Sequence, residues 1–110
     1  MSASAPHPKA AVLQYTARGS HDKTLPIAEA LITAAAEAGA KIICLPECAN
    51  FLAADKASLK ANAEEEANSP SLALFTRLAK KHQIILSAGS LMMAGDMKKM
   101  AMTGWPIAAF

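Results

Sequence analysis

The sequence has little of several features that mark other classes of protein. Only two of its 110 residues are cysteines, Cys44 and Cys48, and so small and closely spaced a pair does not make the disulfide framework of a secreted domain, so we expect reduced thiols. No apolar run approaches the roughly 18 residues of a membrane span, and no apolar segment follows a basic start. These absences predict a cytoplasmic protein without a membrane partner.

Charge is also sparse and nearly balanced. Lys and Arg number 11 and Asp and Glu number 9, which gives a formal net charge of +2. Because the basic residues are scattered rather than gathered into a stripe, we expect no nucleic-acid partner. The chain is 53% hydrophobic, which at this length is sufficient for one globular domain with a modest core.

Three short apolar runs have the length and composition of β-strands. They occupy residues 9–15, 41–46 and 83–90. In the second, KIICLP, every residue after Lys41 is apolar, which is typical of a parallel strand that is covered on both faces. Helical patterns separate the three runs. The order strand, helix, strand, helix, strand with short links predicts an α/β fold, in which right-handed crossovers join the strands of a parallel sheet.

The first helix is expected between about residues 22 and 38, where apolar residues recur with three-and-four spacing. Asp22 or Thr24 is the expected N-cap. Pro26 should then lie in the first turn, where its missing N–H costs little, and Gly39 should end the helix in a left-handed conformation.

The second helix is signalled at both of its ends. Ser69 is the expected N-cap and Pro70 the first helical residue, and the helix should continue to Lys80 and Lys81, whose charge complements the helix dipole. Between residues 51 and 66 the pattern is weaker, and we expect one short helix flanked by loops.

Glu47 directly follows the second predicted strand. Open α/β sheets gather their ligand-binding crevice at the carboxyl ends of the strands. A carboxylate there should be half desolvated, which suits a general base that takes a proton and later returns it. The alternative is an ordinary surface glutamate after a strand, and position alone favours that alternative.

Three blocks of sequence together resemble the start of the nitrilase superfamily of carbon–nitrogen hydrolases. They read KAAVLQY, then EAGAKIICLPE, then SPSLALFTRLAKKHQIILSAGS, and they agree with the family in order and spacing over about residues 9–96. In the family a Gly-Ala pair, a buried strand and a Leu-Pro-Glu sequence lead to the first member of a Glu-Lys-Cys triad. The matching positions here are Gly39, Ala40, Leu45, Pro46 and Glu47.

The resemblance implies a partial, truncated form of the family's four-layer α-β-β-α sandwich, with some strands of each of its two sheets. It implies that Glu47 is the general base and acid of a hydrolase of amidase or nitrilase type, without cofactor or metal, acting on a small amide or nitrile. The family's Lys and Cys come later in its chain, and neither has a counterpart here, so an inactive fragment is expected. Full-length members tend to form homo-oligomers, and a truncated unit should expose one face of its sheet.

The cysteines are interpreted as packing residues. Cys48 is adjacent to Glu47, and neighbouring side chains on an extended strand point to opposite faces, so its thiol should not meet that carboxylate. Cys44 lies within an apolar strand and should behave as a small buried hydrophobe. The pair lacks further ligands at zinc-binding spacing.

The other candidate residues also have structural interpretations. His82 should be solvated or complement the dipole at a helix end, and His7 and His21 fall in the lead and a loop. The acidic run of Glu64, Glu65 and Glu66 indicates a solvated face rather than a metal site. Five methionines lack a helical stripe and are given little functional weight: Met92, Met93, Met97, Met100 and Met102.

Residues 97–110, MKKMAMTGWPIAAF, follow neither the helical nor the strand period. Translation from the third base of the Met97 codon permits Glu-Lys-Asn-Gly-Asn-Asp-Arg-Leu-Ala-Asn-Arg-Ser-Phe, which resembles the family's continuation. Our hypothesis is a frameshift near Asp96 or Met97. The chain is thus divided into a disordered lead (1–8), a carbon–nitrogen hydrolase part (9–96) and a non-family tail (97–110).

Two non-catalytic alternatives stay open. A small α/β binding module, for instance flavodoxin-like, should carry a Gly-rich phosphate loop, but the turn after the first strand contains only Gly19. The second alternative is a regulatory subunit that pairs with a full-length relative. No docking patch for such a partner is evident in the sequence.

Overall fold

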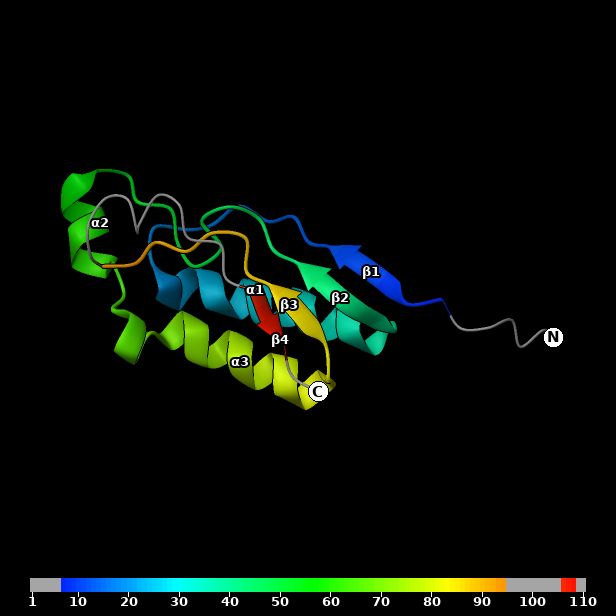
Figure 1. Cartoon of the computed structure of the whole chain (residues 1–110). Coiled ribbons are helices and arrows are strands. Elements are labelled where there is room, and N and C mark those ends of the chain that lie inside the picture. The colour runs from blue at the N-terminus through cyan, green and yellow to red at the C-terminus, as the bar shows by residue number, and fades with distance from the viewer. Residues whose placement is uncertain (1–6, 95–105, 109–110) are drawn as a thin grey trace.

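The strands of the chain form one sheet in the computed structural model, which describes residues 7–94 and 106–108. In sheet order, within these residues, the strands are β1 (Lys9–Val12), β2 (Ala40–Cys44), β3 (Ile85–Ser87) and β4 (Pro106–Ala108). The first three run parallel, as predicted, and β4 runs antiparallel to β3 (Figure 1). The expectation that the strands are shared between two sheets is wrong for the described residues.

The strands are shorter than the apolar runs that predicted them. After β2 a single hydrogen bond, from the Leu45 amide to the Ser87 carbonyl oxygen (2.8 Å), continues toward β3, and Pro46 then has no N–H to donate. The strand β4 lies in the tail and was not predicted, because three residues are too few to show a period.

Two long helices pack side by side on one face of the sheet (Figure 1). These are α1 (His21–Glu37) and α3 (Pro70–His82). Between helices and sheet lies a single apolar core whose main side chains are at most 1% exposed. They include Ala28 and Ile32 from α1, Phe75 and Leu78 from α3, Ile43 from β2 and Leu86 from β3.

Among the described residues, most of those on the opposite face of the sheet are partly or largely exposed. Ile43 is buried, whereas its neighbour Ile42 is 39% exposed and Val12 of β1 is 81% exposed. The exposed sheet face was expected. The apolar run, however, predicted a second strand covered on both faces, which is wrong, since its side chains are fully buried only where they meet the helices.

The start of α1 differs from the prediction. Its N-cap is Ser20, not Asp22 or Thr24. The Thr24 hydroxyl donates to the Ser20 carbonyl oxygen (2.9 Å) and accepts from the Arg18 amide (2.8 Å). Thr24 is therefore buried inside the first turn, where it ties the helix to the preceding loop.

The earlier start moves Pro26 beyond the first turn, so its predicted place is also wrong. Its missing N–H leaves the carbonyl of Asp22 without the usual partner, but both residues are exposed, so that carbonyl costs little where solvent can reach it. Gly39 ends the helix as predicted, with φ of +100°.

The helix α3 is capped as predicted. The Ser69 side chain accepts a hydrogen bond from the Leu72 amide (3.0 Å), and Pro70 is the first helical residue. The helix ends one residue beyond Lys81, and Gln83 follows in a left-handed conformation with φ of 52°.

The expected short helix is α2 (Lys56–Asn62), whose N-cap Asp55 accepts from the Ser58 amide at 2.7 Å. A 3-10 turn, η1 (Glu66–Asn68), leads into α3. Figure 1 shows α2 at the far end of the molecule from β1.

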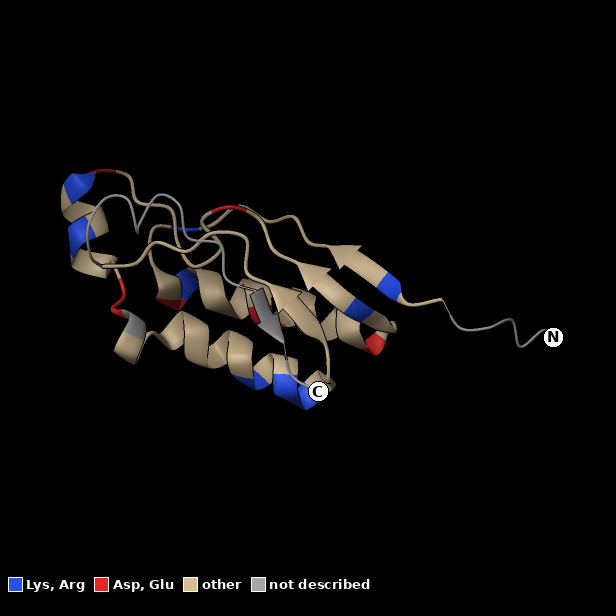
Figure 2. Cartoon of the chain, viewed as in Figure 1, with Lys and Arg blue, Asp and Glu red and all other residues tan. Residues whose placement is uncertain are grey.

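Charged residues are dispersed along the ribbon apart from a basic group at the end of α3, and most residues of β1, β2 and β3 are uncharged (Figure 2). Within residues 7–94 and 106–108, no helix has the length and apolarity needed to cross a bilayer. Most of the predicted disordered lead and the proposed frameshift point lie outside the described residues.

Candidate active site

Three loops meet where β1, β2 and β3 end, and the middle one carries Glu47. We call residues 45–52, which follow β2, the Glu47 loop. It lies between the loop after β1 (residues 13–20) and the segment after β3 (residues 88–94), and hydrogen bonds join it to both. Parallel strands bring their carboxyl ends to one edge of the sheet, which is why these segments converge.

On the β1 side, two hydrogen bonds hold the Glu47 loop. The Tyr15 hydroxyl donates to the Ala49 carbonyl oxygen (2.8 Å), and the Leu52 amide donates to the Arg18 carbonyl oxygen (2.8 Å). Burial raises the pKa of Tyr15, so its phenol stays protonated and remains a donor at neutral pH.

On the β3 side, Ser90 accepts hydrogen bonds from two consecutive backbone amides of the loop. The Cys48 amide donates to the Ser90 hydroxyl oxygen (2.9 Å) and the Ala49 amide to the Ser90 carbonyl oxygen (2.8 Å). Gly89 makes this approach possible, because a Cβ at its position would lie 2.3 Å from the Pro46 carbonyl oxygen. The Glu47 loop is therefore held on both sides through its backbone.

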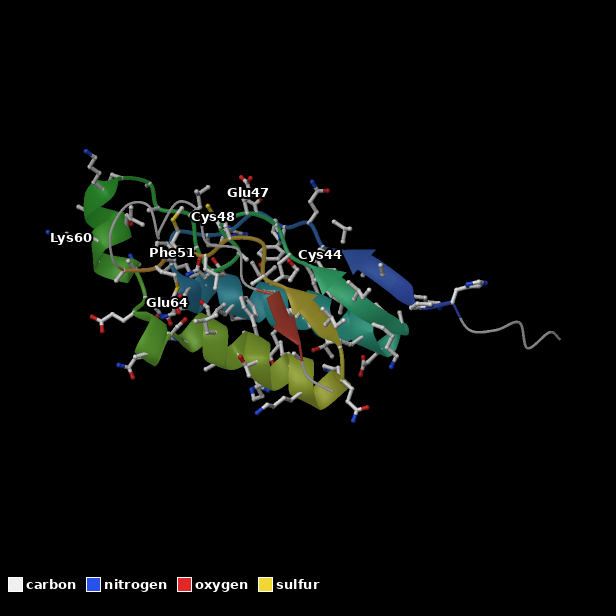
Figure 3. All side chains as sticks on the ribbon, viewed as in Figure 1. Cys44, Glu47, Cys48, Phe51, Lys60 and Glu64 are labelled. Atoms are coloured by element: carbon white, nitrogen blue, oxygen red, sulfur yellow. The ribbon has the colours of Figure 1, made fainter. Side chains whose placement is uncertain are left out.

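The Glu47 side chain projects outward from this framework (Figure 3). It is exposed, and among the residues that the structure describes it accepts no hydrogen bond. The expectation of a half-desolvated carboxylate is therefore wrong for this structure. The physical reason is that the hydrogen bonds that hold the loop use its backbone groups and the Asn50 side chain, and Glu47 takes part in none of them. The assignment of Glu47 as the acid–base residue stays a prediction.

Cys48 adopts a left-handed conformation with φ of 51°, so the assumption of an extended strand at this position was wrong. Burial raises the pKa of the Cys48 thiol, and the neighbouring Glu47 charge raises it further. A thiol held in its protonated form is a poor nucleophile. Cys44 is half-buried in β2, and both cysteines are free.

Glu64 is the polar residue that sequence reasoning missed. It was expected on a solvated face but is only 4% exposed, whereas Glu65 is exposed as expected. Its carboxylate accepts hydrogen bonds from Ser69, Ser71 and Asn50. The available signal was the Ser-Pro-Ser sequence five residues later, which starts a helix whose free amides attract a carboxylate.

The histidines form no constellation with these groups. His82 lies in the last turn of α3, but it is half-buried, and its Nε2 has no partner among the described residues. His21 opens α1 rather than lying in a loop, with Nε2 3.2 Å from Asp22 Oδ1.

No group of three or more His, Cys, Asp or Glu residues with metal-binding geometry occurs in the described part of the chain. Met93 is a core residue at 2% exposure, and Met97, Met100 and Met102 lie outside the described residues. A surface hollow of about 980 Å³ lies along η1 and α3. None of its lining residues belongs to the Glu47 loop, so it is not the candidate site.

A family model for carbon–nitrogen hydrolases matches residues 9–104. The chain belongs to the carbon–nitrogen hydrolase family. The family that the sequence indicated is thereby confirmed, and the match includes the Glu47 loop and Glu64. A search of curated proteins finds no relative that matches. The match extends beyond Asp96, where the sequence pattern weakens, and the proposed frameshift stays a hypothesis.

Solved structures of the superfamily share the fold. The NitFhit protein of C. elegans matches with a TM-score of 0.70 and 27% identity over 88% of this chain and 24% of its own. Nit3 of Saccharomyces cerevisiae, a member of branch 10 of the nitrilase superfamily, matches with a TM-score of 0.64 and 23% identity over 86% of this chain and 36% of its own.

A carbon–nitrogen hydrolase from Helicobacter pylori matches with a TM-score of 0.61 and 23% identity, over 80% of this chain and 31% of its own. This chain therefore spans 24–36% of the lengths of these three proteins. The α/β unit is accordingly a partial nitrilase-type fold.

Proposed function

We propose that this chain carries the acid–base residue, Glu47, of a hydrolase that acts on small linear amides. One observation carries the proposal. In a member of the carbon–nitrogen hydrolase family, a glutamate stands three residues after the end of β2, at the edge where three parallel strands end. Its exposed carboxylate is available to groups outside the described residues, and the backbone that carries it is fixed from both sides.

In the proposed reaction, Glu47 accepts the proton of a cysteine thiol, and the sulfur attacks the amide carbon. The carbon–nitrogen bond then breaks, Glu47 returns the proton to the leaving nitrogen, and ammonia departs from a thioester. Water attacks the thioester while Glu47 accepts its proton. The carbon–sulfur bond then breaks and Glu47 returns the proton to the departing sulfur, which releases a carboxylic acid and restores the thiol. A lysine stabilises the negative oxygen of each tetrahedral intermediate.

In the proposed account, the 110-residue chain supplies neither the nucleophilic cysteine nor the lysine. Cys48 is unsuited to the nucleophile's role because burial and the Glu47 charge both raise its thiol pKa. In Figure 3, Lys60 projects from α2 away from the Glu47 loop. We therefore propose that the 110-residue chain does not turn over amides by itself.

The test is ammonia release from a panel of small ω-amides. The 110-residue chain is compared with a version in which the reading frame is shifted at codon 97, and with Glu47→Gln and Glu65→Gln in that version. Glu65 is an exposed glutamate outside the Glu47 loop and serves as the matched control. Activity should appear only in the shifted version, be abolished by Glu47→Gln and survive Glu65→Gln. Turnover by the 110-residue chain would contradict the Glu-Lys-Cys account, and a folded but inactive shifted version would favour the binding-module alternative.

A further inference from the structure

Glu64 is a buried acid that the proposed reaction does not use. It lies between α2 and η1, and its backbone forms an isolated parallel bridge with Met93 after β3. The residue is 4% exposed. Figure 3 shows it on the inner side of the turn between α2 and α3, whereas Glu47 faces outward. An ionisable side chain is rarely buried unless several partners stabilise it.

Both oxygens of the Glu64 carboxylate are saturated by donors. Oε1 accepts from the Ser69 hydroxyl (2.7 Å) and the Ser71 amide (2.9 Å). Oε2 accepts from the Ser71 hydroxyl (2.6 Å) and the Asn50 side-chain amide (2.8 Å). The Ser71 N–H and the Asn50 NH₂ can only donate, so each requires an acceptor oxygen, and the ionised carboxylate accepts at both oxygens. Burial raises the pKa of Glu64, but these hydrogen bonds outweigh burial and leave it lowered.

Asn50, which belongs to the Glu47 loop, connects that loop to Glu64. Its Nδ2 donates to Glu64 and also to the Met92 carbonyl oxygen (2.9 Å), while its Oδ1 accepts from the Met92 amide (2.8 Å). The Asn50 side chain is 0% exposed. It is three residues beyond Glu47, so fixing it fixes the end of the turn that Glu47 begins.

We propose that Glu64 is a positioning residue which, through Asn50, locks the Glu47 loop onto the segment after β3. The consequence for catalysis rests on the proposed function, but the lock itself involves only described residues. The groups packed against Glu64 from the loop, from α3 and from the segment after β3 are Asn50, Ser69, Ser71 and backbone around Met92 and Met93. None of these titrates near neutral pH, so protonation of Glu64 is what releases the lock.

If Glu64 only capped α3, the variants below would behave differently, and this difference distinguishes a capping role from the proposed lock. Asn50→Ala leaves the Ser69 and Ser71 bonds to Glu64 in place. It should raise the exchange rate of the Met92 amide about tenfold or more, as expected for losing a buried hydrogen bond, and leave the Leu72 amide unchanged. Glu64→Gln should accelerate exchange at both amides, and Glu65→Gln at neither. Unchanged Met92 exchange in both Asn50→Ala and Glu64→Gln would overturn the proposal.

The decisive readout needs no variant that must fold. In ¹⁵N-labelled 110-residue chain, the Asn50 side-chain NH₂ resonances should shift with pH in one step below the usual range of a glutamate, and Glu65→Gln should keep that step. Side-chain resonances of Asn50 that stay constant until the whole spectrum changes would refute the lock. In an active frame-shifted version, Glu64→Gln should lower kcat about tenfold and leave KM within about twofold. Inactivity of that version would defeat the proposed function without touching the NMR result.

Discussion

The close approach of Gly89 to the Glu47 loop can be tested by replacing Gly89 with alanine. Gly89 has φ of +69°, and an added Cβ would lie 2.3 Å from the Pro46 carbonyl oxygen and 2.6 Å from that of Leu45. The left-handed conformation costs an alanine about 1–2 kcal/mol. Displacing two backbone carbonyls adds about 1–3 kcal/mol, by analogy with overpacked cores. The expected loss of unfolding free energy is therefore about 2–5 kcal/mol.

Two other glycines provide a graded control series. Gly39 has φ of +100°, but its added Cβ would meet only the flexible Lys9 side chain, at 3.6 Å or more, so Gly39→Ala should lose only the conformational part, about 1–2 kcal/mol. Gly19 has nothing within 4 Å. Gly19→Ala should be neutral or stabilising by up to about 1 kcal/mol.

The assay is urea unfolding at pH 7 followed by far-UV circular dichroism. With a denaturant slope of about 1–2 kcal/mol per molar for a small domain, Gly89→Ala should lower the midpoint by about 1–5 M. The urea midpoint should be highest for Gly19→Ala, lower for Gly39→Ala and lowest for Gly89→Ala. If Gly89→Ala unfolds at the midpoint of Gly19→Ala, the close packing of the segment after β3 against the Glu47 loop is wrong.

Three further predictions concern the same framework. Tyr15→Phe removes the hydrogen bond to the Ala49 carbonyl oxygen and should lower the free energy of unfolding by about 0.5–1.5 kcal/mol. An unchanged urea midpoint would contradict that bond. Ser69→Ala removes the cap of α3 and one hydrogen bond to the Glu64 carboxylate. It should lower the free energy of unfolding by at least about 1 kcal/mol, with faster amide exchange at Leu72, and unaltered exchange there would contradict the cap. Hydrogen bonds lower the pKa of Glu64 against the opposing effect of burial, so its contribution is complete above the unfolded pKa and is lost as the pH falls through the folded one. The urea midpoint should therefore fall more between pH 6 and pH 3 in the parent chain than in Glu64→Gln, and equal falls would show that Glu64 is not the group responsible.

Much of the fold is predictable because its signals are local. The N-cap at Ser69, the proline after it and the left-handed Gly39 are set by residues adjacent in sequence, and the structure confirms all three. The start of α1 was misplaced because Ser20 occupies the N-cap position without a side-chain cap hydrogen bond. Thr24, a plausible cap by composition, is instead engaged with Arg18 across the preceding loop.

The candidate site was less predictable, because it depends on contacts between distant segments. Glu47 was identified from the family pattern, but its exposure follows from the turn at Cys48 and from how Ser90 and Tyr15 hold the loop backbone. Glu64 was missed because adjacent like charges usually mark a solvated face. Only the approach of Asn50, 14 residues earlier in the chain, together with the start of α3, makes its burial favourable.

The central claim is that Glu47 is the acid–base residue of a carbon–nitrogen hydrolase, and ammonia release tests it most directly. Glu47→Gln and Glu65→Gln are compared in the frame-shifted chain with the ω-amide on which that chain is most active, after circular dichroism has shown equal folding. The account predicts that Glu47→Gln abolishes ammonia release while Glu65→Gln retains it. Undiminished release by a folded Glu47→Gln chain would contradict the account.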